Sequence, residues 1–514
     1  MSVYNKKVEV PTVTNLRGGT AYEQSDEVAL VSLMATGLTS MFHEPSNERE
    51  KRLVELIHSV VNKDIFLTAQ IIIYARAVMG QRTITHRAAV ELAKVISGEP
   101  WGKRFFSKRS RKENSGGVIW RLDDMLEIAA CYFALNPGKA LSNPMKKGFR
   151  SVIETTDAYE LAKYKGNGKM VSLVDMVNLL HPKGKENAKA LKALVEGTLK
   201  QFNTAEDKNT EAGQKVAAKV KAGTITKEEG EVELKEAKAS NWKELIETKK
   251  IGYLSLLRNL KNIVTSAPQL VHQAGELLTN EKFVRESLVF PHQIDLAVEE
   301  LLEGSTSFAV REIMTYAEKA YELATMNVKK LFPEGGETAI VIDSSGSMTS
   351  DYAHVSGPQM KRKVKPVDKS ALIAATLAKG IKGDLFHFSY DCEQLTYNPN
   401  DSINTLKQQF LRHCHGGTTN FNAIFKAFRK PYTRVFIISD MQGADSLDYK
   451  SYKSIYGCNP YIYSIDLCGH GTSMFKQNDR LFPIAGYSAQ IYETAKLYET
   501  DYNALLNEIR KIII

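Results

Sequence analysis

The spacing of apolar residues divides the chain into a helical first part and an alternating second part. From about residue 25 to 330, apolar residues recur every three or four positions, which predicts amphipathic helices. After residue 335, short apolar runs alternate with helical stretches, which indicates a parallel sheet covered by helices. The boundary at 331–336 contains Pro333, Gly335 and Gly336, residues that break regular structure.

Individual elements follow from this pattern. The first part is expected to hold helices at 27–37, 48–61, 65–79, 85–97, 125–135 and 172–180. Short helix pairs of this kind can stack as HEAT repeats do, although no fixed repeat period is visible. The segment 204–240 is rich in Lys, Glu and Ala, so it is expected to be a solvated helical pair or a partly mobile insertion. The second part is expected to hold strands at 338–342, 384–388, 435–439 and 461–466, and helices at 370–381, 421–428 and 499–513.

Oxygen-bearing side chains follow two of the predicted strands. Asp343, Ser345 and Ser347 come directly after the first strand, and Asp440 follows the strand at 435–439. Ligand sites in open α/β sheets lie beyond the carboxyl ends of the strands. Asp and Ser supply hard oxygen ligands, which suit Mg²⁺ or Mn²⁺. Taken alone, the first of these loops is equally consistent with a serine-rich turn without a ligand.

Composition restricts the class of protein. A chain of 514 residues, 43% hydrophobic and 25% charged, is expected to form two or more globular domains. We expect no membrane-spanning helix and no signal peptide, because apolar runs are short and the first residues lack an apolar core. The five cysteines are odd in number and none shows C-x-x-C spacing, so a disulfide framework or a zinc site is not expected. A reducing cytoplasm fits best.

Basic side chains gather in two regions of the first part. The segment 101–112 contains six cations and no acid, interleaved with Trp101, Phe105 and Phe106, so it is either an RNA-contacting segment with base stacking or a solvated loop. The second region leads into His181, which alternatively caps the C-terminus of the preceding helix. Its candidate phosphate-binding residues are Lys147, Arg150, Lys163, Lys165 and Lys169. The net charge of +9 is modest, so this clustering matters more than the total.

A third candidate lies at the start of the helix expected at 85–97. Thr85 is a possible N-cap, which would place His86 and Arg87 at an anion-attracting helix N-terminus. This arrangement is compatible with a phosphate contact but does not by itself establish one.

The second part resembles a von Willebrand factor A domain with a metal-ion-dependent adhesion site. The resemblance rests on the order of three segments: 343–348, the glycine-bearing loop 415–421, and 434–440. It implies as metal ligands Asp343, Ser345, Ser347, Thr419 and Asp440. Thr419 is preferred to Thr418 because Thr-Asn before an apolar residue is closer to the family. The family's Asp-Gly is replaced here by Asp440 and Met441.

The whole chain resembles the TROVE-module proteins of the Ro autoantigen family, of bacterial or phage type. The segments that carry this resemblance are 15–22, 74–76, 82–89, 163–165, 175–183 and 256–262, followed by the metal-site segments. The family's Lys-Tyr-Lys-Gln-Arg stretch is changed here to Lys163-Tyr-Lys-Gly-Asn-Gly-Lys169, which loses one RNA-contacting arginine. The insertion at 204–240 is a further departure.

The resemblance implies a fold of two domains: a HEAT-like helical-repeat ring (TROVE module, 1–334) closed by a doubly wound α/β domain of von Willebrand factor A type (335–514). It implies an RNA-binding ribonucleoprotein component that holds single-stranded 3′ ends of misfolded or noncoding RNA in the ring and Y-like RNA outside it. Lys163, Lys165 and His181 would belong to the outer surface, with Lys147 and Arg150 nearby. His86 and Arg87 would lie near the cavity. The expected cofactor is Mg²⁺.

Two other functions fit the same residues. A metal-dependent protein-interaction scaffold would use the α/β domain as its main site and the helices as a docking surface. A metal-dependent hydrolase would use Asp343 and Asp440, but the motifs contain no second carboxylate cluster and no general base close by. We therefore expect a non-enzymatic cytoplasmic monomer without membrane contact, which works in RNA quality control or stress. An exoribonuclease or another protein is an expected partner.

Overall fold

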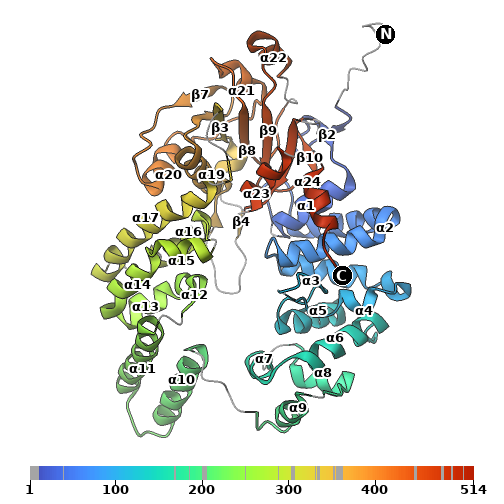
Figure 1. The fold of residues 1–514 in the computed structure, drawn as a ribbon, viewed down its shortest axis with the longest axis vertical. Coiled ribbons are helices and arrows are strands. Elements are labelled where there is room, and N and C mark those ends of the chain that lie inside the picture. The colour runs from blue at the N-terminus through green and yellow to red at the C-terminus, as the bar shows by residue number, and fades with distance from the viewer. Residues whose placement is uncertain are drawn as a thin grey trace.

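The structure is a computed structural model of the whole chain. It describes residues 11–514 except 39, 111, 167–169, 185, 200–204, 249–250, 288, 303–306, 330, 333–335, 351–352, 355–362, 445–448, 476–479, 488–489, 500 and 502. Two helical arms descend on opposite sides of the molecule from an α/β domain at the top (Figure 1).

The first arm is a succession of helices that pack on helices one or two places along the chain. Its helices are α1 (Asp26–Thr36), α2 (Ser46–Ala77), α3 (Thr83–Leu92), α4 (Gly102–Phe105), α5 (Leu122–Leu135), α6 (Asn143–Thr155), α7 (Ala158–Lys163), α8 (Leu173–Leu180) and α9 (Ala188–Val195). α2 unites two predicted helices across a kink at Asp64, whose backbone leaves the helical region (φ −157°, ψ 92°). α3 ends five residues earlier than predicted and gives way to a 3₁₀ turn, Ile96–Gly98.

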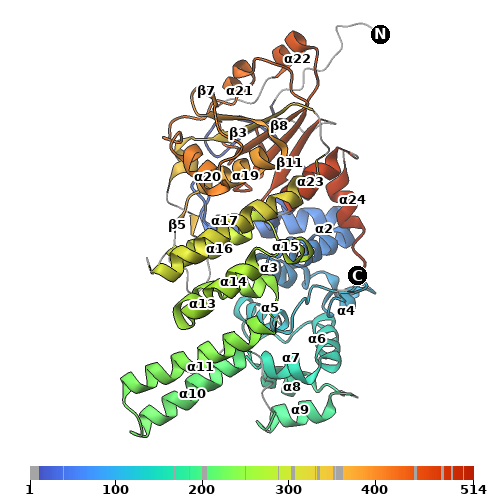
Figure 2. The same ribbon diagram turned by 60° about the vertical axis from the view of Figure 1, so that its left-hand side comes forward.

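The second arm continues the pattern on the other side of the molecule. Its helices are α10 (Ala205–Lys221), α11 (Lys227–Glu247), α12 (Tyr253–Arg258), α13 (Leu260–Ser266), α14 (Val271–Leu278), α15 (Glu281–Ser287), α16 (Pro291–Leu302) and α17 (Phe308–Lys329). α10 and α11 form an antiparallel hairpin (Figure 2), so the helical-pair interpretation of the Lys- and Glu-rich segment is confirmed. Gly230 allows the two helices of the hairpin to approach, because a Cβ there would lie 2.8 Å from Val220 and 3.0 Å from Val216.

The α/β domain contains a six-stranded sheet. The strands are β3 (Thr338–Asp343), β6 (Asp384–Phe388), β7 (Cys392–Leu395), β8 (Arg434–Ser439), β9 (Tyr461–Asp466) and β11 (Leu481–Ala485), in the order β11-β9-β8-β3-β6-β7. All neighbours are parallel except β7, which pairs antiparallel with β6 at the edge. The four predicted strands are confirmed at these positions. The helices are α18 (Gly346–Thr349), α19 (Pro366–Ile381), α20 (Ile403–Leu411), α21 (Asn422–Ala427), α22 (Lys450–Tyr456), α23 (Gln490–Tyr498) and α24 (Ala504–Arg510).

Alternate side chains of the central strands enter two different cores. Ala339 and Val341 of β3 face one side, where they join the aromatic residues of α21 and α22. Ile340 and Ile342 face the other side and belong to a cluster that includes α19, α20 and the buried residues of both arms. One face of the sheet is therefore continuous with the cores of both helical arms.

Each arm meets the α/β domain at its own joint. α1 packs on β11 and α2 packs on α24, and the amide of Gln70 donates to the carbonyl oxygens of Arg510 (2.8 Å) and Ile512 (3.0 Å). In the second arm, α16 and α17 pack on α19 and α20. There the Lys407 ammonium lies 2.9 Å from the Asp295 carboxylate, and both side chains are nearly buried.

The N-terminal segment does not join the helical arm to which the sequence assigned it. β1 (Val13–Thr14) pairs with β2 (Thr20–Glu23), and β2 pairs antiparallel with β10 (Thr472–Ser473) of the α/β domain. Strands β1 and β2 thus form a small sheet with β10 of the α/β domain.

Several elements were not predicted from the sequence. They are β7, β11, α20 and α23, which carry few uninterrupted apolar residues or follow irregular loops. The final helix is shorter than predicted. Helix α2 contains one window that is long and apolar enough to cross a membrane, which the sequence analysis did not expect. Half of that window is buried in the protein, as in a core helix. All five cysteines are free, as predicted.

The joint between Asp295 and Lys407 yields a prediction about stability. Lys407→Ala leaves the Asp295 carboxylate buried without its cation, which is expected to lower the free energy of unfolding by about 3 kcal/mol. Thermal unfolding followed by circular dichroism should show a clearly lower midpoint. Lys51→Ala breaks an exposed ion pair with Glu48 and should leave the midpoint unchanged. Equal midpoints for both variants would refute a stabilising role for the joint.

Candidate metal centre and basic surfaces

Three loops meet at the carboxyl ends of β3 and β8 and are joined to one another by backbone hydrogen bonds. The amide of Gly346 donates to the carbonyl oxygen of Gly417 (3.0 Å), and the amide of Gly416 donates to that of Ser344 (3.0 Å). Gly416 and Gly417 have positive φ (+85° and +120°). Glycine adopts this conformation without steric cost, which explains the glycine pair in the sequence. These bonds fix the positions of the side chains that the sequence analysis proposed as ligands.

The proposed ligands bring oxygen atoms together in a buried site. The hydroxyls of Ser345 and Ser347 lie 3.2 Å apart. Asp343 accepts hydrogen bonds from the Ser345 amide (2.8 Å) and the Ser439 hydroxyl (2.5 Å). Asp440 Oδ1 accepts one from the amide of Gln442 (3.1 Å). Asp440 Oδ2 is buried, and no described residue donates a hydrogen bond to it.

The charges of this site would favour a bound cation. Burial raises the pKa of Asp343, and hydrogen bonds from Ser439 and Ser345 and the charge of Arg17 only partly oppose this. Burial also raises the pKa of Asp440, and the neighbouring Asp343 charge raises it further. Two buried carboxylates next to each other are stable as anions when a cation lies between them. The orphaned Asp440 oxygen and the hydroxyl groups provide the hard donors that a divalent cation needs.

The ligand set combines carboxylates with hydroxyls. Among the residues that the structure describes, no group of three or more His, Cys, Asp or Glu side chains is placed to hold a metal. A cation here would therefore take Asp343, Asp440, Ser345 and Ser347 together with a threonine. Thr419 is 1% exposed, whereas Thr418 is exposed, and this favours Thr419.

Met441 occupies the position at which the family has the glycine of Asp-Gly. Its backbone is left-handed, with φ of +57°, a conformation that costs a residue with a side chain about 1 kcal/mol. The side chain is 1% exposed, and its sulfur accepts a hydrogen bond from Ser464 (3.1 Å). Burial of the methionine side chain offsets the backbone strain, so Asp440 keeps its position without the glycine.

The N-terminal segment lies on the rim of this site, which the sequence analysis did not foresee. Arg17 Nη1 donates to Thr419 Oγ1 at 2.9 Å. Asn15 Nδ2 donates to the carbonyl oxygen of Gly443 (2.7 Å), directly after the Asp440 loop. Gly19 has no room for a side chain, because a Cβ would lie 2.0 Å from the same carbonyl oxygen. The segment 15–22 was one of those that carried the family resemblance, but the sequence did not indicate that it lies beside this site.

Basic residues of the first arm surround helix α8. Arg150 Nε donates to the Leu180 carbonyl oxygen (2.8 Å), which places its guanidinium beside His181 at the end of α8. His181 is exposed and is itself the left-handed C-cap of α8, so the capping interpretation is correct for its backbone. Lys147 is exposed on α6, which packs on α8. Lys147, Arg150 and His181 have no carboxylate partner among the described residues.

Lys163 and Lys165 lie at the other end of α8. Lys163 is exposed, and its ammonium lies 5.7 Å from the centre of the Tyr164 ring. The Lys165 carbonyl oxygen accepts from the amide of Leu173 (2.9 Å), at the start of α8. Since α8 has eight residues, its two ends are about 12 Å apart. Lys169 lies outside the described residues.

His86 and Arg87 have internal partners. Helix α3 begins at Thr83, so Thr85 is not its N-cap. The buried His86 ring lies 3.1 Å from Asp124 Oδ1, and Arg76 binds the same carboxylate through Nε and Nη2 at 3.0 Å. Arg87 pairs with Glu50 (2.6 Å) and Glu91 (3.0 Å). Two of the motifs that carry the family resemblance therefore meet at Asp124 inside the arm, and an RNA contact by His86 or Arg87 stays a prediction.

The base-stacking interpretation of the segment 101–112 is wrong for two of its aromatic residues. Phe105 and Phe106 are fully buried in the arm, where each ring packs edge-to-face on another. Arg109 is 3% exposed and donates to carbonyl oxygens of Asn114 and Gly116. Much of this basic segment thus forms core and turn structure.

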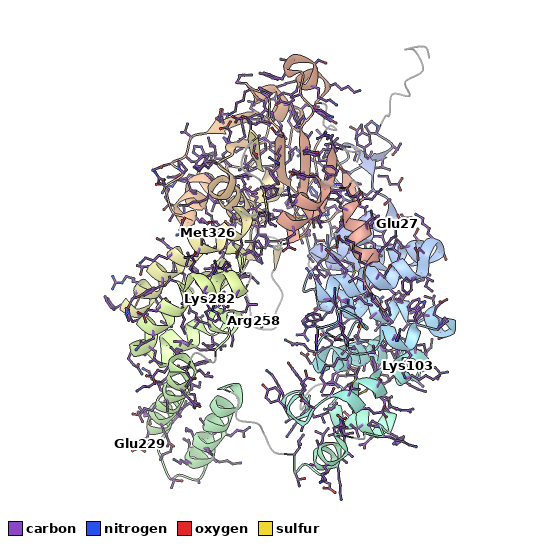
Figure 3. All side chains as sticks on the ribbon, in the orientation of Figure 1. Glu27, Lys103, Glu229, Arg258, Lys282 and Met326 are labelled. Carbon is purple, nitrogen blue, oxygen red and sulfur yellow. The ribbon has the colours of Figure 1, made fainter. Side chains whose placement is uncertain are left out.

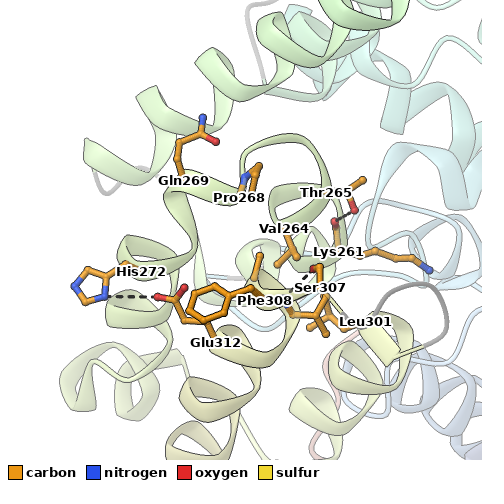
Figure 4. A pocket seen from close by; sticks show the side chains of 12 residues that line it. Lys261, Val264, Thr265, Pro268, Gln269, His272, Leu301, Ser307, Phe308 and Glu312 are labelled. Carbon is orange, nitrogen blue, oxygen red and sulfur yellow. Dashed lines mark hydrogen bonds and ion pairs between the residues drawn. The ribbon is translucent and has the colours of Figure 1, made fainter.

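The second arm has a pocket of about 880 Å³ between α13, α14 and α17 (Figure 4). Val264, Leu301 and Val310 give it an apolar lining, and the exposed ring of Phe308 lies at its edge. Lys261 also lines it. Arg258, three residues before Lys261, lies at the edge of the second arm that faces the first arm (Figure 3).

Comparison with known proteins identifies the family. Residues 76–331 match the TROVE domain. A search of curated proteins finds no match. The crystal structure of the Ro (RSR) protein of Deinococcus radiodurans is similar in fold, with a TM-score of 0.57 over 92% of this chain and 99% of that chain at 18% sequence identity. The fold class predicted from the sequence is confirmed, and the chain belongs to the TROVE-domain family of Ro-like proteins.

Proposed function

We propose that this protein is the RNA-binding component of a ribonucleoprotein and acts on noncoding or misfolded RNA. Single-stranded 3′ ends would enter between the two arms, and a structured, Y-like RNA would bind the outer surface around α8. The TROVE domain supports RNA as the ligand. The role proposed is binding without catalysis, in RNA quality control or the response to stress.

The observation that carries this proposal is the placement of cations around α8. Lys163 and Lys165 lie at one end of the helix, and Arg150 and His181 lie at the other. A span of about 12 Å suits contacts with several successive phosphates of one RNA strand. These side chains project from short helices and turns, so they can follow the shape of a structured RNA, whose backbone is read more readily than its bases.

Two cations on the second arm support the proposed path of the single strand. Arg258 and Lys261 belong to adjoining helices, α12 and α13, and Arg258 is exposed towards the first arm (Figure 3). A single strand offers unstacked bases as well as phosphates, and the apolar pocket beside Lys261 has room for a base. A duplex presents its bases only within the stack, so it would gain nothing from this pocket.

The candidate metal centre would hold a divalent cation, and Mg²⁺ is proposed because its ligands are hard oxygens. Asp343, Asp440, Ser345, Ser347 and Thr419 would bind it. When bound, the cation supplies a positive coordination site at the surface of the α/β domain. The chain's own residues hold the loops in place around it through the hydrogen bonds between Gly346, Gly417, Gly416 and Ser344.

The outer surface is tested by a gel-shift titration with one structured RNA, with and without a single-stranded 3′ tail. Lys163→Ala/His181→Ala is expected to weaken binding of the structured part about tenfold and to lower the salt dependence by about one unit. Binding of the tail should stay unchanged. A matched control, Lys51→Ala/Lys511→Ala, removes two exposed cations elsewhere and should bind as the wild type does. Equal losses in both double variants would reject a specific outer surface.

The path of the single strand is tested by reversing charge between the arms. Arg258→Glu/Lys261→Glu is expected to weaken binding of the 3′ tail at least tenfold and to spare the structured part, because repulsion replaces two phosphate contacts. The same titration on Lys450→Glu/Lys453→Glu, a double reversal on α22 at the far end of the molecule, controls for net charge (Figure 1). Tail binding that survives the first variant would place the strand elsewhere.

The metal centre is tested by Asp440→Asn, which keeps the shape of the side chain and removes one buried charge. Mg²⁺ is expected to raise the unfolding temperature of the wild type above that in EDTA, because a ligand of the folded state stabilises it. In Asp440→Asn the Mg²⁺ effect should vanish, while the midpoint in EDTA should rise because one buried carboxylate charge is gone. Asp157→Asn, a helix N-cap at which both residues serve equally well, is the matched control. A Mg²⁺ effect that persists in Asp440→Asn would contradict the assignment.

A further inference from the structure

The pocket of about 880 Å³ in the second arm has a positive end and a negative end (Figure 4). Lys261 of α13 lies at one end, and Glu312 of α17 lies with His272 of α14 at the other. The wall between them includes the buried side chains of Val264 and Leu301. An apolar cavity of this size with a few polar groups is typical of a site for a small molecule.

The charges at the two ends are not neutralised within the part of the chain that the structure describes. There, no carboxylate pairs with the Lys261 ammonium, and neither a lysine nor an arginine pairs with Glu312. His272 Nδ1 lies 4.0 Å from Glu312 Oε1 but only 2.7 Å from the Tyr316 hydroxyl. With that hydroxyl as the donor, the imidazole carries its proton on Nε2, which lies 3.5 Å from Glu276. Glu312 therefore keeps acceptor oxygens for a ligand.

The negative end is held in place by a close fit between two helices. The Tyr316 ring lies against Gly275 of α14, where a Cβ would be 2.3 Å from a ring atom. A residue with a side chain at position 275 would displace the tyrosine. The hydrogen bond between Tyr316 and His272 then fixes the imidazole beside Glu312.

Phe308 offers an aromatic face at the same pocket. The residue is 75% exposed at the first position of α17, and no other described aromatic ring packs on it. A large apolar side chain in water gains by covering its ring, and a nucleobase is a planar group that stacks on such a ring.

We propose that this pocket binds one nucleoside 5′-monophosphate whose base carries an exocyclic amino group. The base would stack on Phe308 and donate from its amino group to Glu312, and the phosphate would lie at Lys261. Cytosine, adenine and guanine carry such an amino group, whereas uracil has a carbonyl oxygen that a carboxylate repels. The ligand is a free nucleotide or the last nucleotide of an RNA strand. In the second case the inference deepens the proposed path of the single strand and rests on it.

The test uses the full-length chain with CMP and UMP, which match in size and differ at the amino group of the base. Isothermal titration calorimetry gives the two dissociation constants. The wild type is expected to bind CMP about tenfold more tightly than UMP. Glu312→Gln keeps the size of the side chain and should abolish this preference, because an amide can accept from the cytosine amino group and can also donate to the uracil oxygen.

Three further variants separate stacking from charge. Phe308→Ala should weaken both nucleotides about tenfold without changing the preference, and Phe308→Trp should restore binding. Lys261→Ala should weaken CMP about fivefold and leave cytidine, which has no phosphate, unchanged. Ile455→Ala removes an exposed apolar side chain from α22, at the far end of the molecule, and should change nothing (Figure 1).

The source of the nucleotide is distinguished with a structured RNA whose 3′ tail ends in C or in U. A preference for C that Glu312→Gln removes supports the inference, for the terminal nucleotide if it occurs with the tails and for a free nucleotide if it occurs only with CMP. Equal binding of C and U in both experiments, or a preference that survives Glu312→Gln, would overturn it. The proposed path of the strand would still stand in that case if Arg258→Glu/Lys261→Glu weakens binding of the tail.

Discussion

The arrangement of the whole molecule depends on one face of one sheet. Alternate residues of β3, β6, β8 and β9 point to a core that both helical arms share. The first arm reaches this core through α1 and α2, and the second through α16 and α17. The helices at both ends of the helical part cover the same apolar face of the sheet. Both arms therefore start from the same place on the α/β domain. The common starting point of the two arms thus follows from burial at the sheet.

Polar interactions determine how each arm is oriented at that face. The nearly buried pair of Asp295 and Lys407 lies where the second arm meets α20. On the other side, Glu44 binds both Arg49 and Arg52, and Arg52 donates to the carbonyl oxygen of Gly469 (2.6 Å). Burial opposes the charge of Glu44, but hydrogen bonds from His470 and Arg52 lower its pKa to about 2. Such groups tolerate little displacement, because a buried charge without its partner is costly. The joints therefore fix the orientation of the arms, whereas the apolar core supplies the adhesion.

Sequence periodicity predicted the division into domains of different architecture because helical and strand periods differ over long stretches. The strands β3, β6, β8 and β9 were predictable from their apolar runs, and the convergence of Asp343 and Asp440 followed from the geometry of parallel strands. The position of Arg17 was not predictable, because a pairing between β2 and β10 depends on contacts across most of the chain. The same limit applies to Phe105 and Phe106, which look like stacking residues beside six cations but point inward. Charge clusters in a sequence do not show which side chains are neutralised within the fold.

The pairing of basic side chains with carboxylates inside the fold decides where this protein can attract an anion. The net charge of +9 is spread over 68 basic residues, and many of them have carboxylate partners. Arg76 and His86 bind Asp124, and Arg87 binds Glu50 and Glu91, so their positive charge is balanced inside the first arm. Among the described residues, Lys147, Arg150 and His181 beside α8 have no carboxylate partner, and neither has Arg17. Both places offer a positive potential, but they differ in construction. The α8 surface spreads its charges along a helix, which suits a polyanion, whereas Arg17 places one charge beside the candidate metal centre. A long phosphate backbone gains from several distributed cations at once. Under the proposed function, the distribution of unbalanced charge thus separates an RNA surface on the first arm from the candidate metal centre of the α/β domain.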